Sequence, residues 1–297
     1  MSVFTSHHAV PIKFTKDSWA ILDTVEQSIK DKIEKYGTPL KEWGINIYRG
    51  VLTGCNEAFI IDGAKRAELI AADPKSDEII RPILRGRDIK RYGYDFADLW
   101  LINIECGSTN ANRCSLAPEE YIKNTYPAIY EHFIDIANRP TRGKGLKGRD
   151  DMGDYWWELR SCAYTNDFSK QKIAYREISD EMGACLIDDE YFLNNKCYII
   201  TGNIDLKPLV AYLNSNLFTQ IVLQMVNTTG GKGADFIDKL HAPNLTANQV
   251  NKLGTLVEQI QVCQSNVLDE QIDQIIYEAF NLSLDEIDFL NKRKRSQ

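Results

Sequence analysis

Several segments of the 297-residue sequence have glycines or polar side chains at spacings that occur in cofactor or catalytic sites. Gly143, Gly145 and Gly148 form a G-x-G-x-x-G motif. Such a motif holds a dinucleotide or S-adenosylmethionine where a strand precedes it and the N-terminus of a helix follows it. Here a helical pattern and Pro140 precede the glycines, and residues 149–153 follow without apolar periodicity. The segment is therefore predicted to be a flexible basic loop.

Three other patterns are also incomplete. The segment 227–233 (NTTGGKG) lacks the G-x-x-x-x-G-K-[ST] spacing of a phosphate-binding loop and indicates a surface loop. The segments 88–90 (DIK) and 205–207 (DLK) match half of a metal-dependent nuclease site, without its Pro-Asp partner. The histidines show no metal-ligand or triad spacing; they are His7, His8, His132 and His241. The sequence predicts no catalytic residue, no cofactor and no metal in this chain.

Charge is distributed unevenly. The net charge of −7 disfavours nucleic acid, which is bound largely through phosphate neutralisation. However, residues 246–290 hold eight acidic residues and one basic residue, whereas five basic residues lie within 81–91 and five within 139–149. Two basic clusters on an acidic protein can still form an electrostatic surface for nucleic acid.

Two further features concern location. No apolar run approaches the roughly 20 residues that span a bilayer, and the N-terminus lacks the pattern of a signal peptide. The seven cysteines include no C-x-x-C pair and indicate reduced thiols. We expect a cytoplasmic protein.

The apolar pattern predicts an α+β fold with a mixed or antiparallel, β-rich core and peripheral helices, because the β-like runs do not alternate regularly with helices. Helices are expected over 17–36, 65–72, 119–137 and 207–226. Strands are expected over 45–49, 58–62, 99–104, 155–160, 172–176 and 197–201. Within 155–160 the two adjacent tryptophans would point to opposite faces of a strand.

After residue 245 the sequence is helical. Thr246–Gln249 and Ser283–Glu286 have the spacing of capping boxes, each followed by apolar residues at helical intervals. The chain is expected to divide into a connector with one amphipathic helix (1–43), a main domain (44–245) and a C-terminal helical segment with a basic tail (246–297).

Two segments rich in glycine and arginine point to a family. Residues 48–59 read YRGVLTGCNEAF, and residues 79–92 read IIRPILRGRDIKRY. With 155–160 (YWWELR), Lys172–Ile173, 213–215 (LNS), 272–277 (IDQIIY) and Leu282–Ser283, they agree in order and spacing with one pattern over about residues 45–290. In this the chain resembles the TaqI-like C-terminal specificity domain of type IIG restriction–modification enzymes and related adenine-N6 DNA methyltransferases.

The resemblance implies that residues 44–245 form a target-recognition domain that reads a short duplex sequence. In the family, a catalytic domain placed N-terminally flips an adenine and methylates its N6 with S-adenosylmethionine. The Asn/Asp-Pro-Pro-Tyr/Phe loop of that domain is absent from this sequence. We therefore expect a bacterial chain that recognises DNA without reacting. S-adenosylmethionine, and any Mg²⁺, would belong to the other domains of the parent enzyme.

The resemblance also suggests site residues, because base-edge contacts specify a sequence and phosphate contacts hold the register. The expected base-reading residues are Arg49, Thr53, Asn56, Arg85, Arg87 and Lys90. The expected phosphate contacts are Arg91, Arg142, Lys144, Lys147, Arg149 and Lys232. Asp88 has a second interpretation, as an ion-pair partner of Arg85 or Arg91.

Two alternatives stay open. The acidic helices of 246–290 could dock a separate methyltransferase or nuclease, which would make the chain a protein-interaction subunit. A free-standing nuclease with an unrecognised site would instead cleave DNA in the presence of metal.

Overall fold

The computed structural model describes residues 24–140, 143–176, 183–222 and 240–296. Its helices are α2 (Thr24–Tyr36), α3 (Asn56–Phe59), α4 (Gly63–Ala72), α5 (Ser108–Asn112), α6 (Pro118–Thr125), α7 (Pro127–Ala137), α8 (Gly145–Gly148), α9 (Lys207–Leu213), α12 (Ala247–Val262), α13 (Asn266–Ala279) and α14 (Leu284–Ser296). Its strands are β1 (Gly37–Pro39), β2 (Ile45–Arg49), β3 (Ile60–Asp62), β4 (Ile80–Leu84), β5 (Leu99–Ile102), β6 (Lys172–Arg176), β7 (Ala184–Ile187), β8 (Phe192–Leu193), β9 (Cys197–Gly202) and β10 (His241–Pro243).

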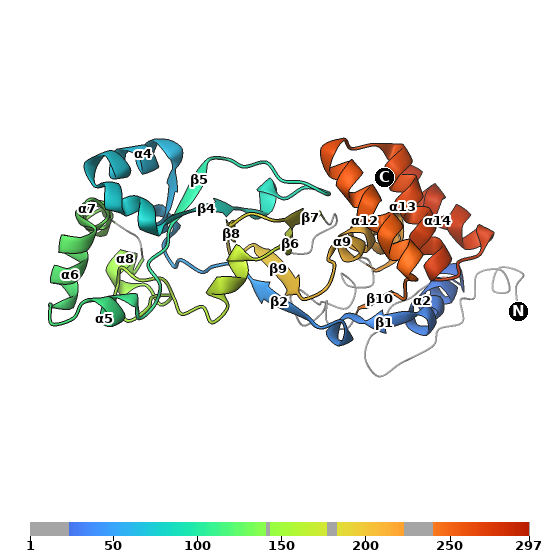
Figure 1. The fold of residues 1–297 in the computed structure, drawn as a ribbon, viewed down its shortest axis with the longest axis horizontal. Coiled ribbons are helices and arrows are strands. Elements are labelled where there is room, and N and C mark those ends of the chain that lie inside the picture. Colours follow the sequence, from blue (N-terminus) through green and yellow to red (C-terminus); the bar gives the residue numbers. More distant parts are fainter. Residues whose placement is uncertain (1–23, 141–142, 177–182, 223–239, 297) are drawn as a thin grey trace, which may run out of the picture.

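The molecule is elongated, with helices at both ends and β-sheets between them (Figure 1). Helices α4–α8 occupy one end, and α2 lies with α12–α14 at the other. The expected α+β class is confirmed. No helix in the described ranges is long and apolar enough to cross a membrane, and all seven cysteines are free thiols.

The strands form two four-stranded sheets and one small ribbon. The central sheet has the order β2-β9-β6-β7 and is antiparallel throughout. The outer sheet has the order β3-β5-β4-β8 and is mixed, because β8 runs parallel to β4. Strands β1 and β10 make the ribbon. The short link between β8 and β9, residues 194–196, therefore carries the chain from one sheet to the other.

The central sheet is buried on both faces and joins two hydrophobic cores. Successive side chains of a strand point to opposite faces. Ile173, Tyr175 and Ile200 face a first core built with α2, α9 and α12–α14. Ala174 and Ile199 face a second core built with α3, α4 and α6–α8. The alternation along β6 and β9 thus couples the two ends of the molecule.

The C-terminal helices begin where the capping boxes predict. The Thr246 amide donates to Gln249 Oε1 at 2.9 Å, and the Ser283 amide donates to Glu286 Oε2 at 2.6 Å. Glu286 also accepts from Lys32 Nζ at 2.7 Å. The cap of α14 therefore also fastens this helix to α2.

The expected strand over 155–160 is wrong, and the structure has turns there. The cause is Glu158, whose fully buried carboxylate accepts hydrogen bonds from the amides of Asp154 and Tyr155 at 2.9 and 3.3 Å. These bonds curl the chain back on itself, so it cannot extend. Trp157 is buried and donates from Nε1 to Thr109 Oγ1 at 3.0 Å.

Other boundaries differ in smaller ways. The strands at 45–49 and 172–176 are confirmed, and the strand expected over 99–104 ends at Ile102. Residues 56–59 are helical, so the strand expected over 58–62 begins at Ile60. Pro127 lacks an amide donor and begins a new helix, which divides the helix expected over 119–137. Of the helix expected over 207–226, α9 and a turn of π-helix at Phe218–Val222 are present, and residues 223–226 lie outside the described ranges.

The division into segments 1–43, 44–245 and 246–297 stays a prediction. The cores divide the described residues differently, because α2 and the C-terminal helices share the first core with α9.

Candidate functional site

The link Asn194–Lys196 between β8 and β9 is a tight turn held by its first residue. The Cys197 amide donates to the main-chain oxygen of Asn194 at 2.9 Å, and the Lys196 amide donates to Asn194 Oδ1 at 3.2 Å. The Asn194 side chain is therefore used to build the turn. The next residue, Asn195, is partly exposed.

The first glycine–arginine segment lies directly against this turn. Gly50 donates to the main-chain oxygen of Cys197 at 2.9 Å, and a Cβ at residue 50 would lie 2.0 Å from the main-chain oxygen of Asn194. Only glycine allows so close an approach of two backbones. Arg49 is exposed, and its Nε donates to the main-chain oxygen of Asn195 at 2.8 Å.

The second segment meets the same turn from the other side. The Asn194 amide donates to the oxygen of Leu84 at 3.0 Å, and a Cβ at residue 86 would lie 3.3 Å from the main-chain oxygen of Lys196. Segments 36 residues apart therefore converge on the β8–β9 turn. We call Arg49–Gly50, Arg85–Arg87 and Asn194–Lys196 together the motif junction.

Within the motif junction Arg85 is held in place by an ion pair. Its Nε and Nη2 atoms donate to the two oxygens of the buried Asp88 carboxylate at 2.9 and 2.8 Å. Burial opposes ionisation of Asp88, but the hydrogen bonds from Arg85 outweigh it and lower the pKa of this carboxyl. The second interpretation of Asp88, as a partner of Arg85, is confirmed. The pair fixes the turn Gly86–Asp88, and Arg87 is exposed on it.

The remaining base-reading candidates differ in exposure. Lys90 is exposed and donates from Nζ to the main-chain oxygen of Arg87 at 2.9 Å. Asn56 is exposed at the start of α3. Thr53 is buried, and its hydroxyl donates to Asn56 Oδ1 at 2.6 Å. Thr53 therefore positions Asn56 and does not present its own hydroxyl at the surface, which corrects the expected base contact.

Arg149 corrects the expected phosphate contacts. Its side chain is buried, and its donors are taken by five main-chain oxygens; these belong to Thr53, Leu146, Asp151, Trp156 and Glu158. Burial lowers the pKa of Arg149 to about 10, so the group is still charged at neutral pH. The guanidinium therefore holds the basic segment against the first glycine–arginine segment, through its bonds to the main-chain oxygens of Leu146 and Thr53. Its donors cannot reach DNA.

The other residues of the basic segment lie nearer the surface. Lys144 is exposed and pairs with Asp150 at 2.5 Å, and Lys147 Nζ lies 4.8 Å from the centre of the Trp156 ring. Both stay candidates for phosphate contact. The expected flexible loop contains the short helix α8, with Leu146 buried. Arg142 and Lys232, the remaining two phosphate candidates, lie outside the described residues, as does 227–233.

Arg91 forms a bridge to the C-terminal helices. Its Nη2 donates to Asp269 Oδ1 at 2.7 Å and to the main-chain oxygen of Asn214 at 3.0 Å. Burial lowers its pKa, but interaction with Asp269 outweighs burial, so the pKa of Arg91 is raised. The structure gives Arg91 a role in holding α13 against the second glycine–arginine segment.

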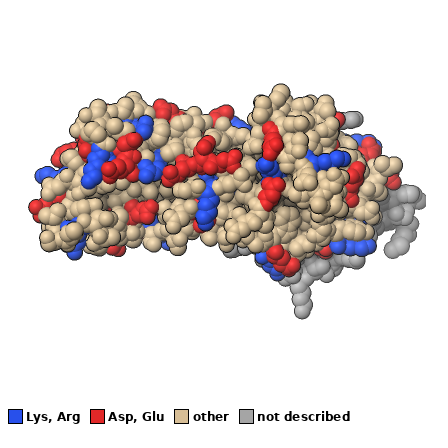
Figure 2. Space-filling model, in the orientation of Figure 1, with Lys and Arg blue, Asp and Glu red and all other residues tan. Residues whose placement is uncertain are grey.

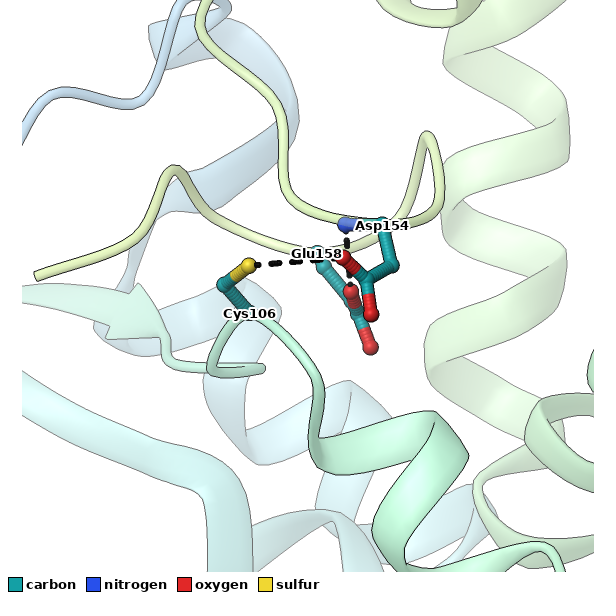
Figure 3. Close-up of side chains that lie close together, drawn as sticks. All are labelled: Cys106, Asp154 and Glu158. Atoms are coloured by element: carbon teal, nitrogen blue, oxygen red, sulfur yellow. Dashed lines mark hydrogen bonds between the residues drawn. The ribbon is translucent and has the colours of Figure 1, made fainter.

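Cys106, Asp154 and Glu158 offer ligand atoms that lie within 4.8 Å of one another (Figure 3). The Glu158 carboxylate accepts four main-chain amides, from Gly107 and Thr109 at 3.1 and 3.0 Å as well as from the 154–155 turn. Four donors use the acceptor capacity of a carboxylate. The cluster is therefore a structural carboxylate site and does not fit a metal.

A cavity of about 340 Å³ opens beside the motif junction. Its walls include Arg49, Glu105 and Arg160. Tyr164 forms part of the wall, stacks on Tyr48 with ring centres 4.3 Å apart, and donates to the main-chain oxygen of Arg49 at 2.9 Å. Arg49 is thus fixed at both its main chain and its side chain, so its position is set before any ligand binds.

The face of the molecule in Figure 2 carries acidic and basic side chains close together. Among the described residues drawn there, no continuous basic surface is visible. On this face the described basic side chains are therefore interspersed with acidic ones.

Sequence reasoning missed the β8–β9 turn and the buried Lys172. The dipeptide Asn194–Asn195 between two apolar runs is a signal for a turn, but nothing in the sequence indicates which segments surround it. Lys172 begins β6 fully buried, and its Nζ donates to three main-chain oxygens, of Phe168, Lys170 and Asp189, at 2.8, 3.1 and 2.8 Å.

The chain is similar to one protein family and to solved restriction enzymes. The TaqI-like C-terminal specificity domain family matches residues 81–239. No curated protein matches the sequence. The type IIL restriction–modification enzyme MmeI, solved in complex with DNA, is similar with 11% identity and a TM-score of 0.49, over 83% of this chain and 35% of that one.

The type IIG restriction endonuclease BpuSI is similar with 13% identity and a TM-score of 0.49, over 86% of this chain and 33% of that one. The chain thus spans about a third of the length of each enzyme. The family match covers more than half of the 297 residues, and the chain belongs to the TaqI-like C-terminal specificity domain family.

Proposed function

We propose that this chain recognises a short sequence of duplex DNA through the motif junction. The observation that carries the proposal is the convergence of both glycine–arginine segments on the β8–β9 turn, where Nε of Arg49 is anchored at 2.8 Å. Family membership supports the same conclusion, because the family is one of specificity domains. Recognition requires side chains whose position is fixed before binding, and the junction supplies them.

The chemistry of the junction suits base edges. A guanidinium anchored at Nε keeps its two Nη atoms for a paired contact, and guanine O6 and N7 accept such a contact in the major groove. Arg87 and Lys90 are exposed nearby on the same glycine–arginine segment and can contact a base or a phosphate. Lys144 and Lys147 would add phosphate contacts, which are independent of sequence and weaken as salt rises.

We further propose that the chain is the C-terminal part of a type II restriction–modification enzyme or of a site-specific adenine-N6 DNA methyltransferase. Its role there is recognition. Methyl transfer with S-adenosylmethionine, and any Mg²⁺-dependent cleavage, would be carried out by other domains of that enzyme.

Selection of binders from a random duplex pool by the purified chain, at low and moderate salt, tests the proposal. We expect an enriched motif of a few base pairs that persists as salt rises. Binding without a motif, lost at moderate salt, would mean that only phosphate contacts operate, and it would contradict sequence recognition by this chain.

A second function, docking of a separate catalytic protein, has one specific observation in its favour. Val262 and Val267, at the end of α12 and the start of α13, are 89% and 60% exposed. Both border a groove between these acidic helices. If the chain binds no duplex at either salt concentration and co-purifies with a methyltransferase or nuclease, docking is its function.

A further inference from the structure

Asn195 stands apart from the other residues of the β8–β9 turn. The side chain of Asn194 makes the turn, whereas the side-chain amide of Asn195 makes no hydrogen bond within the described residues. Asn195 is partly exposed. An asparagine amide has one acceptor and two donor positions. The turn therefore carries one side-chain amide that forms no hydrogen bond in the described part of the chain.

The main chain of the same residue positions Arg49. Because Nε of Arg49 is bound to the Asn195 oxygen, the remaining edge of the guanidinium, with Nη1 and Nη2, faces away from that bond. In the described part of the chain these Nη atoms have no hydrogen bond or ion pair. The Arg49 guanidinium and the Asn195 amide thus both offer hydrogen-bonding groups without partners among the described residues. The main chain of Asn195 holds the guanidinium near this amide.

The hydrogen-bonding groups of these two side chains are complementary to the major-groove edges of the two purines. Arginine pairs with O6 and N7 of guanine, and asparagine pairs with N6 and N7 of adenine. Neighbouring bases of a strand are about 3.4 Å apart, and the bond from Arg49 Nε to the main-chain oxygen of Asn195 holds these two residues next to each other. We propose that Asn195 is a specificity-determining residue that reads adenine, next to a guanine read by Arg49. This inference rests on the proposed function and names the base contact within it.

The chemistry of neighbouring residues explains why Asn195, rather than Lys196, fills this role. Lys196 offers donors only and cannot distinguish the acceptor–donor pattern of adenine. Asn194 has its Oδ1 engaged by the Lys196 amide. Asn195 therefore carries the unused amide of the turn.

The test compares duplex selections by the full chain and three variants: Asn195→Ala, Asn195→Asp and Asn251→Ala. Asn251 is an exposed asparagine of α12 and serves as the matched control. Equal melting temperatures would establish that each variant is folded. We expect the unsubstituted chain and Asn251→Ala to select the same motif, with adjacent guanine and adenine.

Asn195→Ala is expected to lose the adenine preference, by roughly 5- to 150-fold, and to retain the others. Asn195→Asp offers only acceptors and is expected to change that position to cytosine, whose N4 amino group is a donor. A purely structural asparagine would not produce this change of base. If the unsubstituted chain selects a motif and both Asn195 variants select the same one, the inference is wrong and the proposed function stands. If the unsubstituted chain selects no motif, both are wrong.

Discussion

Arg49 donates from Nε to the main-chain oxygen of Asn195 at 2.8 Å, across 146 positions of the sequence. This bond joins the first glycine–arginine segment to the β8–β9 turn. The second segment reaches that turn through the bond between the Asn194 amide and the oxygen of Leu84. The two glycine–arginine segments are therefore held together by the β8–β9 turn. The sequence of that turn contains no glycine–arginine motif.

Gly50→Ala is expected to separate the first segment from the turn. A Cβ at this position would lie 2.0 Å from the main-chain oxygen of Asn194 and 2.4 Å from that of Leu193, so we expect a loss of about 1–3 kcal/mol in the free energy of unfolding. Gly93→Ala is the matched control, since a Cβ there meets nothing within 4 Å. Urea unfolding measures both. Equal stability of the two variants would contradict the close approach at Gly50.

Arg149→Met is expected to destabilise the protein by about 3 kcal/mol, because five main-chain oxygens lose the guanidinium that they share. Lys144→Met lies in the same segment on an exposed side chain, and its effect should be within about 0.5 kcal/mol. Thermal and urea unfolding of both variants check this expectation. If Arg149→Met does not change the free energy of unfolding, the hydrogen bonds of this guanidinium contribute nothing to stability.

Lys172 makes stability depend on pH in a predictable direction. Burial lowers the pKa of this ammonium to about 8, below its value of about 10.4 in an unfolded chain. Between these values the unfolded chain binds more protons, so this residue's contribution to stability rises with pH. We expect a gain of roughly 2 kcal/mol between pH 7 and pH 9.5.

Because other groups titrate in the same range, the measurement is the difference between the protein and Lys172→Met at each pH. The variant should lack this part of the rise, whatever its absolute stability. Parallel curves for the two proteins would contradict the lowered pKa.

The Arg91–Asp269 ion pair links the second glycine–arginine segment to α13 and can be measured by a double-mutant cycle. Arg91 is 43% exposed, so solvent screening limits the coupling between the two side chains to about 0.5–1 kcal/mol. Arg91→Ala should leave the salt dependence of DNA binding unchanged, whereas Lys147→Ala should reduce its slope by about one. A reduced slope in Arg91→Ala would restore Arg91 as a phosphate contact.

Sequence patterns predicted those parts of the fold that depend on local periodicity. Strands β2 and β6 and both capping boxes follow from the alternation of apolar residues and from cap spacing. The error at 155–160 has a tertiary cause, because the buried Glu158 carboxylate accepts from the amides of Gly107 and Thr109, about 50 residues away, as well as from those of the 154–155 turn. Local aromatic content favoured a strand, and a buried carboxylate made a turn.

The sequence showed which motifs contribute to the site, but it did not show how these motifs are arranged in space. Arg49 and Arg85 stand out in the sequence, but their roles differ, since Arg85 is paired with Asp88 and Arg49 is anchored to the turn. In the sequence Arg149 and Lys144 are equivalent members of one basic cluster. In the structure Arg149 is buried and Lys144 is exposed. Which arginine is buried depends on tertiary packing, and no local pattern records it.

The most direct test of the account is the ratio of two dissociation constants at about 150 mM salt, for a scrambled duplex and for the duplex selected by this chain. Sequence recognition through a preformed motif junction predicts a ratio of at least about 10³ in favour of the selected duplex. Equal affinity for the two duplexes would contradict the account, because it would leave only contacts to phosphate.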